Sequence, residues 1–267
     1  MRAVLIDLDG VLYVGDNPVH GAAASIEWLT SESVPFRYLT NTTSRPRQEI
    51  ADKLTGMDID ATPDQILTPA VAATAWLRRH DIRRPAIFVP EATNGEFADM
   101  DPLPHDAEQG AGAVVVGDLG PGWDFATLNR AFRLLMSDSH VPLIALGMTR
   151  FWRAGDGLRL DAGAYVRALE YASGRDAVVL GKPDPAFFRT AVDDLGPQFT
   201  DVVMVGDDIR TDVEAAQHAG LTGVLVRTGK FSPSDLDDVS PDAVLDSIAD
   251  LPQWWERTGA RGRPAPQ

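Results

Sequence analysis

Short β-rich segments alternate with helical segments along almost the whole chain, and this alternation limits the possible folds more than any other feature. The expected strands are Ala3–Leu8, Phe36–Thr40, Ala86–Val89, Ala113–Val116, Leu143–Leu146, Ala177–Leu180, Val202–Val205 and Val224–Val226. The expected helices are Ala22–Ser31, Gln48–Thr55, Ala70–Arg79, Ala126–Met136, Gly163–Ala172, Pro185–Asp194 and Asp212–Ala219. Such alternation predicts an α/β fold in which helices cover both faces of a doubly wound, Rossmann-like parallel sheet. Functional groups in these folds gather at the carboxyl ends of the strands.

The stretch from about Trp76 to Leu180 differs in texture from the rest of the chain. It has scattered Pro and Gly, and the segment Phe151–Leu160 reads as a hairpin that turns through Gly155-Asp156-Gly157. Because the strand ends that carry candidate chemistry lie outside it, we expect residues 76–180 to form an inserted α/β domain. Residues 1–75 and 181–255 then form the core domain, and residues 256–267 a disordered tail. One continuous sheet is the alternative.

Composition excludes several classes of function. The 267 residues contain no cysteine, so disulfide scaffolds, zinc-thiolate sites and thiol catalysis are ruled out. The 24 Lys and Arg against 39 Asp and Glu give a net charge of −15, which argues against nucleic-acid and anionic-membrane partners. Asp7 and Asp9 interrupt the apolar N-terminal run, and no stretch is long enough to span a membrane. A cytoplasmic protein is therefore expected.

Acidic side chains follow two of the expected strands. Asp7 and Asp9 can project to the same side where the first strand ends, and Asp207 and Asp208 follow a later apolar strand. Asp212 comes at the start of the next helix. If both strands are central in one parallel sheet, these acids converge, and so many ionised carboxylates need either raised pKa values or a bound cation. Oxygen ligands without His or Cys point to Mg²⁺.

Two further strand ends supply groups that bind anions. The strand ending near Leu39 leads into Thr40 and Asn41, at the start of a run rich in hydroxyls that precedes a helix. Another leads into Gly181-Lys182-Pro183, which places Lys182 at the same rim. A carboxylate nucleophile with a metal, a lysine and hydroxyl or amide donors around it is what phosphoryl transfer requires.

These segments also carry a resemblance to a known family. They occur in the order Asp7-x-Asp9-Gly10-Val11-Leu12-Tyr13, Leu39-Thr40-Asn41, Gly181-Lys182-Pro183 and Val205-Gly206-Asp207-Asp208. This order resembles the four motifs of the haloacid dehalogenase superfamily, in the subfamily IIA of phosphatases whose large C2-type cap is inserted between the second and third motifs. Similarity extends through Arg167–Tyr171, Phe187-Phe188, Arg227–Phe231 and Pro233–Asp235, to about Asp250.

The resemblance implies a role for each matching residue. Asp7 would attack phosphorus to form an aspartyl-phosphate, and Asp9 would act as general acid and then as general base. Mg²⁺ would be held by Asp7, by the backbone carbonyl of Asp9 and by Asp207. The second shell would contain Asp208 and Asp212, and the phosphoryl oxygens would be held by Thr40, Asn41 and Lys182.

The resemblance implies phosphohistidine, phospholysine or pyrophosphate as the substrate and a homodimer as the assembly. A small phosphorylated metabolite, such as a sugar phosphate or a nucleotide monophosphate, is the main alternative. From other classes, a module phosphorylated on aspartate for signalling and a non-catalytic binding protein stay open. The segment Arg150–Arg153 is as consistent with a substrate-facing loop as with hairpin packing.

Overall fold

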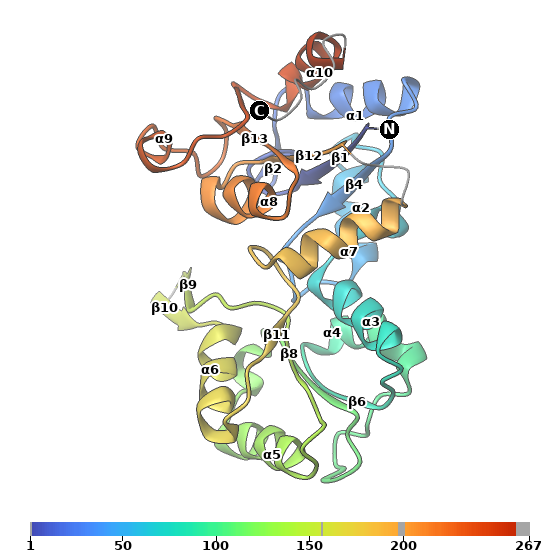
Figure 1. Ribbon diagram of the computed structural model, residues 1–267, viewed down its shortest axis with the longest axis vertical. Helices are drawn as coiled ribbons and strands as arrows, with labels where there is room; N and C mark the ends of the chain where they lie inside the picture. Colours follow the sequence, from blue (N-terminus) through green and yellow to red (C-terminus); the bar gives the residue numbers. More distant parts are fainter. Residues whose placement is uncertain (1, 156, 197–200, 260–267) are drawn as a thin grey trace. The chain divides into compact units, whose positions relative to one another are not determined.

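The computed structural model describes residues 2–155, 157–196 and 201–259. The chain divides into two compact units (Figure 1). The first unit contains Met1–Thr40, Ala51–Ile66 and Ala191–Gln267, and the second contains Asn41–Ile50 and Leu67–Thr190. These divisions fall at other residues than the expected domain boundaries at 75 and 180, which stay a prediction.

The first unit is built around a six-stranded sheet with the strand order β14-β13-β12-β1-β4-β5. Its strands are β1 (Arg2–Asp7), β4 (Phe36–Leu39), β5 (Ile66–Leu67), β12 (Asp201–Gly206), β13 (Thr222–Val226) and β14 (Ala243–Leu245). β1 pairs in parallel with both β12 and β4, and Ile6 lies opposite Val205 and Tyr38. The residues that follow these three strands therefore emerge at one edge of the sheet.

Helices and short turns surround this sheet. They are α1 (Ala22–Ser31), α2 (Arg47–Thr55), η1 (Pro63–Gln65), α7 (Pro185–Leu195), η4 (Ile209–Glu214), α8 (Ala215–His218), α9 (Asp235–Asp238), η5 (Ile248–Asp250) and α10 (Leu251–Gly259), with the small ladder β2 (Tyr13–Val14) and β3 (Asn17–Pro18). By residue range, α2 and α7 each run from one unit into the other. α1 packs against α10, and the Arg2 guanidinium lies 3.8 Å from the ring centre of Trp255.

The second unit has its own four-stranded parallel sheet, in the order β11-β8-β7-β6. Its elements are α3 (Pro69–Arg79), β6 (Pro85–Phe88), α4 (Glu91–Asn94), η2 (Gly95–Met100), β7 (Ala113–Val116), η3 (Gly120–Gly122), α5 (Phe125–Met136), β8 (Leu143–Ala145), β9 (Phe151–Ala154), β10 (Gly157–Leu160), α6 (Ala162–Ser173) and β11 (Val178–Val179). α5 and α6 pack together, and Trp123 stacks between Phe88 and Tyr165.

The predicted α/β class with a separate second sheet is confirmed, and every expected strand is present within one or two residues of its expected bounds. The expected hairpin is formed by β9 and β10, although Asp156 of its turn lies outside the described residues. Across the part of the chain that the structure describes, no helix is both long and apolar enough to cross a membrane.

Two expectations need correction. The helix expected over Asp212–Ala219 starts earlier, as the π-helical turn η4 at Ile209, and is α-helical only over Ala215–His218. The reason is that the Asp208 carboxylate accepts the N–H groups of Arg210 and Thr211 and so caps the turn. The tail expected over residues 256–267 is helical in its first part, because α10 continues to Gly259; residues 260–267 lie outside the described part.

Candidate active site

Three buried carboxylates meet at the carboxyl edge of the sheet in the first unit. Asp7 ends β1, Asp207 directly follows β12, and Asp212 lies in η4. One oxygen from each carboxylate lies within 4.8 Å of the other two. The three residues are only 6%, 1% and 1% exposed, respectively. Three acids this close and this buried repel one another when ionised unless a positive charge lies among them.

The backbone around Asp207 leaves no room for side chains. A Cβ atom added at Gly10 would lie 1.9 Å from Asp207 Oδ2. A Cβ added at Gly229 would lie 2.1 Å from the same oxygen and 2.5 Å from Gly10 Cα. Both glycines also have positive φ angles, of 87° and 65°, which other residues adopt only with strain. The Asp207 carboxylate is thus enclosed by two stretches of bare backbone.

The loop after β13 holds this arrangement together. The Thr228 hydroxyl donates a hydrogen bond to the Gly10 carbonyl, and the Lys230 N–H donates one to Asp207 Oδ2 at 2.7 Å. The Lys230 ammonium lies 3.4 Å from Asp208 Oδ2. Burial alone would lower the pKa of Lys230. The negative charges of Asp207 and Asp208, together with those of Asp212 and Asp7, outweigh the effect of burial and raise the pKa. Lys230 therefore stays positively charged beside the acids.

Asp208 and Asp212 support each other across one helical turn. The Asp208 N–H donates to Asp212 Oδ2 at 3.2 Å, while the Asp208 carboxylate caps η4. Burial acts to raise the pKa of Asp208, but the Thr211 N–H, the Lys230 ammonium and the Arg210 N–H outweigh it and hold the pKa below its usual value. The second-shell role expected for both residues stays a prediction. Asp212 lies close enough to Asp7 and Asp207 to bind a metal directly.

Asp9 lies in the tight turn that follows β1. The Gly10 N–H donates to the Tyr13 carbonyl at 2.7 Å, and the Leu12 N–H donates to the Leu8 carbonyl at 2.9 Å. Asp9 itself is exposed, in contrast to Asp7 two residues earlier. Its carboxylate is not one of the three that cluster, and the acid–base role expected for Asp9 stays a prediction.

The three clustered carboxylates fit a divalent cation with a preference for oxygen. They supply three oxygen ligands from buried side chains, and neither sulfur nor imidazole is among them. Hard ions such as Mg²⁺ prefer this donor set. Binding of such an ion would also relieve the repulsion among the buried acids.

The residues expected to hold the phosphoryl group lie on both units. Thr40 follows β4 in the first unit and is buried. Asn41 and Lys182 belong to the second unit, where Asn41 Oδ1 accepts the Lys182 N–H at 2.8 Å and Asn41 Nδ2 donates to the Lys182 carbonyl at 2.9 Å. The Asn41 amide thus holds the backbone of Lys182, a residue only 6% exposed.

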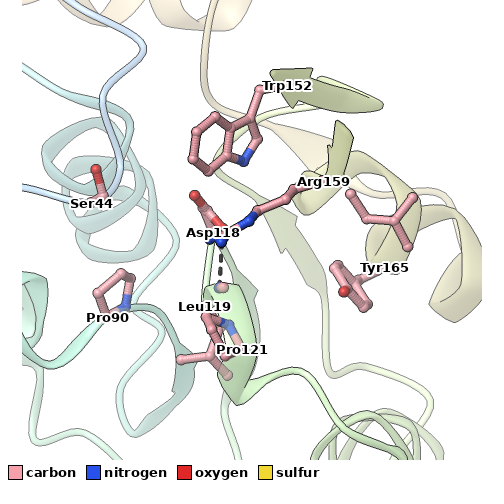
Figure 2. A pocket seen from close by; sticks show the side chains of 10 residues that line it. Ser44, Pro90, Asp118, Leu119, Pro121, Trp152, Arg159 and Tyr165 are labelled. Atoms are coloured by element: carbon pink, nitrogen blue, oxygen red, sulfur yellow. Dashed lines mark hydrogen bonds between the residues drawn. The ribbon is translucent and has the colours of Figure 1, made fainter. Parts of the chain in front are cut away.

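A pocket of about 570 Å³ lies within the second unit, and we call it the Trp152 pocket (Figure 2). Its walls include Ser44, Pro90, Asp118, Leu119, Trp152, Arg159 and Tyr165. Trp152 falls in the segment that the sequence marked as a possible substrate-facing loop. Asp118, Arg159 and Tyr165 were missed, because they come from the loop after β7, from β10 and from α6, and no motif joins them. The loop Thr228–Lys230 was noticed only as part of a family resemblance, although Gly229, which comes shortly after the buried strand β13, could have indicated close backbone packing.

Comparison with known families gives matches to two models along the chain. The model described as haloacid dehalogenase-like hydrolase matches residues 4–101, and the HAD-hydrolase-like model matches residues 179–251. The chain is 35% identical over 256 residues to phospholysine phosphohistidine inorganic pyrophosphate phosphatase of Rattus norvegicus, covering 94% of this chain and 92% of that protein. It is 37% identical over 245 residues to haloacid dehalogenase-like hydrolase domain-containing protein 2 of Homo sapiens, covering 92% and 91%.

Solved structures give a consistent picture of the fold. NagD from Escherichia coli K-12 superposes with a TM-score of 0.80 at 26% identity, covering 93% of this chain and 97% of that one. A 4-nitrophenylphosphatase from Thermotoga maritima superposes with a TM-score of 0.82 at 26% identity, covering 94% and 96%. In both comparisons the likeness extends over nearly the whole chain.

Proposed function

This chain belongs to the haloacid dehalogenase-like hydrolases, and we propose that it is a Mg²⁺-dependent phosphatase that works through an aspartyl-phosphate on Asp7. The observation that carries the proposal is the meeting of Asp7, Asp207 and Asp212 in one buried cluster at the strand ends. Membership of a hydrolase family favours turnover over the signalling and binding alternatives.

The proposed reaction has two steps. In the first, an Asp7 carboxylate oxygen bonds to phosphorus, the bond from phosphorus to the leaving atom breaks, and that atom takes a proton from the Asp9 carboxyl group. In the second, the Asp9 carboxylate takes a proton from water, whose oxygen bonds to phosphorus. The bond from phosphorus to Asp7 then breaks, inorganic phosphate leaves, and both carboxyl groups return to their first state.

The chain's other residues would hold the reactants in place. Asp7, Asp207, the Asp9 backbone carbonyl and Asp212 are the candidates to hold Mg²⁺, which when bound neutralises charge on the phosphoryl oxygens. Lys182, with its backbone fixed by Asn41, would contribute a further positive charge to those oxygens, and Thr40 a hydroxyl.

The names of the relatives suggest two substrate classes. One relative is named for phospholysine, phosphohistidine and pyrophosphate, and a structural relative is named for 4-nitrophenyl phosphate. We propose a phosphoamino acid or a small phosphorylated molecule as the substrate, with pyrophosphate as the inorganic alternative. A homodimer and a cytoplasmic location stay predictions from the sequence.

Phosphate release tests the proposed function directly. Wild type and Asp7→Asn are assayed with and without Mg²⁺ on phosphohistidine, pyrophosphate, an aryl phosphate, a sugar phosphate and a nucleotide monophosphate. We expect Mg²⁺-dependent release that falls at least about 1,000-fold in Asp7→Asn, because the amide cannot act as the nucleophile.

The variant must also keep its fold for this loss to be informative. Asn has nearly the size of Asp, so we expect the circular dichroism spectrum and the melting temperature to change little. Full activity in Asp7→Asn, or release that does not depend on added Mg²⁺ after chelation, would contradict the proposal.

A further inference from the structure

A lysine in the last turn of α2 contacts the hairpin formed by β2 and β3, residues 13–18, which we call the β2–β3 hairpin. The Lys53 ammonium donates a hydrogen bond to the Gly15 carbonyl at 2.7 Å, and it lies 3.9 Å from the centre of the Tyr13 ring. It also lies 3.6 Å from Asp16 Oδ1. All four residues belong to the first unit. One ammonium group thus joins α2 to both the first strand and the turn of the hairpin.

Two of these three contacts should contribute most of the attachment. The Asp16 side chain is almost fully exposed, so water screens its ion pair with Lys53. Tyr13 is buried and the Lys53 side chain is only 22% exposed, so the cation–π contact is better shielded from water. The hydrogen bond to the Gly15 carbonyl has a charged donor, which strengthens it.

The β2–β3 hairpin has little stability of its own. Each of its strands contains two residues, and an isolated pair of short strands is marginal in water. Just beyond the hairpin, the Val19 N–H donates to the Leu12 carbonyl at 2.9 Å. Lys53 adds contacts from a separate helix, and we therefore expect the position of the hairpin to depend on it.

The hairpin is also connected to the turn that carries Asp9. The Gly10 N–H donates to the Tyr13 carbonyl at 2.7 Å, and Asp9 forms an isolated β-bridge with Tyr13. Tyr13 thus holds the peptide group between Asp9 and Gly10, while Lys53 lies over the Tyr13 ring. Because Asp9 is exposed, its position depends more on this backbone than on packing around its side chain.

We propose that Lys53 is a positioning residue for Asp9. Lys53 holds the β2–β3 hairpin through Tyr13 and Gly15, and the hairpin holds the turn from which the Asp9 carboxyl group gives its proton to the leaving atom. This inference rests on the proposed function, in which Asp9 is the general acid. A general acid works only within hydrogen-bond reach of the atom that it protonates, so loss of Lys53 should matter most for substrates that need this proton.

Two aryl phosphates of similar shape differ in this need. The 4-nitrophenolate ion leaves readily without a proton, whereas the phenolate ion is more basic and benefits more from protonation. The ratio kcat/KM includes only the steps up to departure of the leaving group, so the later action of Asp9 as a base on water does not enter it. Displacement of Asp9 should therefore lower kcat/KM for phenyl phosphate more than for 4-nitrophenyl phosphate.

The test compares these two substrates in wild type, Lys53→Met, Lys53→Arg and the control Arg37→Met. Met keeps the unbranched side chain of Lys53 and removes the charge. We expect Lys53→Met to lower kcat/KM about 10-fold for phenyl phosphate and less than about 2-fold for 4-nitrophenyl phosphate. Lys53→Arg keeps a cation and a donor, so both values should stay within about 3-fold of wild type.

Arg37→Met is a matched control in the same unit. The Arg37 guanidinium also donates to a backbone carbonyl, that of Phe36 at 3.1 Å, and it pairs with Asp194 at 2.6 Å. Its side chain is 28% exposed, close to the 22% of Lys53. Its partners lie outside the hairpin, so both values of kcat/KM should be unchanged. Equal losses for the two substrates in Lys53→Met, or the same selective loss in Arg37→Met, would overturn the inference.

Hydrogen exchange at the Gly10 amide separates this inference from the proposed function. The amide donates to the Tyr13 carbonyl, so its exchange rate reports how often the turn opens, whether or not a substrate is hydrolysed. We expect exchange to become about 10-fold faster in Lys53→Met and to stay unchanged in Lys53→Arg and Arg37→Met. If wild type hydrolyses neither substrate but exchange follows this pattern, the proposed function fails and the attachment of the turn to Lys53 stands. Unchanged exchange in Lys53→Met would overturn the inference even in an active phosphatase.

Discussion

The carboxylate cluster of the first unit and the Trp152 pocket of the second unit are built from different kinds of structure. The cluster lies where β1 and β12 end, beneath a loop whose backbone touches Asp207. The pocket is lined by loops, a hairpin and one helix, and Trp152 in its wall is 42% exposed. Buried strands fix the position of a side chain closely, whereas loops and hairpins tolerate substitution. The first arrangement leaves little room for substitution, and the second leaves more.

The difference predicts unequal sensitivity to added atoms. At the cluster, a single methyl group meets backbone or a carboxylate within about 2 Å, as at Gly10 and Gly229. In the Trp152 pocket, a methyl group added to a lining residue would enter a pocket of about 570 Å³ and would change only its shape. Added atoms should therefore be far less well tolerated at the cluster than in the pocket.

Gly229→Ala should have the largest effect after loss of the nucleophile itself. The new Cβ would overlap Asp207 Oδ2 at 2.1 Å and Gly10 Cα at 2.5 Å, so the carboxylate and the backbone beside it must shift from their present positions. We expect the affinity for Mg²⁺ to fall about 100-fold, the upper end of what loss of outer-shell support causes. Isothermal titration with Mg²⁺ measures this without reference to activity.

Gly15→Ala is the matched control for Gly229→Ala. Gly15 also has a positive φ, 61° against 65°, but a Cβ there meets nothing within 4 Å. Both variants should lose about 1–2 kcal/mol of stability from the strained backbone. Only Gly229→Ala should lose affinity for Mg²⁺. A similar loss in Gly15→Ala would mean that backbone strain, rather than overlap with Asp207, governs the metal site.

The sequence was sufficient to predict the main part of the cluster, for a physical reason. β1 and β12 are buried apolar runs, and parallel strands bring their carboxyl ends to the same edge, so Asp7 and Asp207 had to be neighbours once the sheet was assumed. The position of Asp212 beside them depends on the π-helical turn η4. The sequence predicted that this helix begins at Asp212, whereas it begins at Ile209. The Asp208 cap that starts this turn involves only neighbouring residues. The position of the Asp212 carboxylate, which accepts the Asp208 N–H, depends on how the whole turn is folded.

Other parts could not be predicted because their contacts join distant segments. Thr228 contacts Gly10 across 218 positions of sequence, and no periodic pattern records such a contact. The same is true of the Trp152 pocket, where Asp118, Arg159 and Tyr165 meet only after the second sheet has formed. Strand periodicity reports which face a residue takes and says nothing of which loop will cover it.

Thr228→Val should have a smaller effect that tests how the loop holds the cluster. The variant keeps the shape of the side chain and removes the hydroxyl that donates to the Gly10 carbonyl. We expect a loss of about 1 kcal/mol in stability from the hydrogen bond and a fall of about 10-fold in affinity for Mg²⁺. Urea denaturation and titration with Mg²⁺ measure the two effects.

Thr30→Val is the control for Thr228→Val. The Thr30 hydroxyl donates to the Ile26 carbonyl at 3.0 Å within α1, so its loss should leave the affinity for Mg²⁺ unchanged. Unchanged affinity in both variants would show that the loop after β13 does not hold the cluster through Thr228.

Asp161→Asn should have the smallest effect of these substitutions. It tests how well the second unit tolerates a charge on a partly buried acid. Burial raises the pKa of Asp161, the Ala162 N–H opposes the rise, and Asp118 adds to it. A raised pKa means that ionisation of Asp161 costs stability in the folded state, so stability falls as pH rises from the unfolded pKa through the folded pKa. Asn cannot ionise and still caps α6, so the variant should gain stability over wild type, within about 0.5 kcal/mol, as pH rises from 3.5 to 7.

Asp124→Asn, in the same unit, should change the stability in the opposite direction. Asp124 caps α5, and its hydrogen bonds from Thr127 hold its pKa below the usual value. Its ionised form therefore stabilises the folded state above the unfolded pKa, and that stabilisation is lost as pH falls through the folded pKa. Asp124→Asn should accordingly lose stability relative to wild type between pH 3.5 and 7, while Asp161→Asn gains it, in denaturation curves measured at both pH values. If the stabilities of both variants changed in the same direction, burial and Asp118 would not be destabilising the charge on Asp161. The Asp161 carboxylate would then be as well solvated as an exposed helix cap such as Asp124.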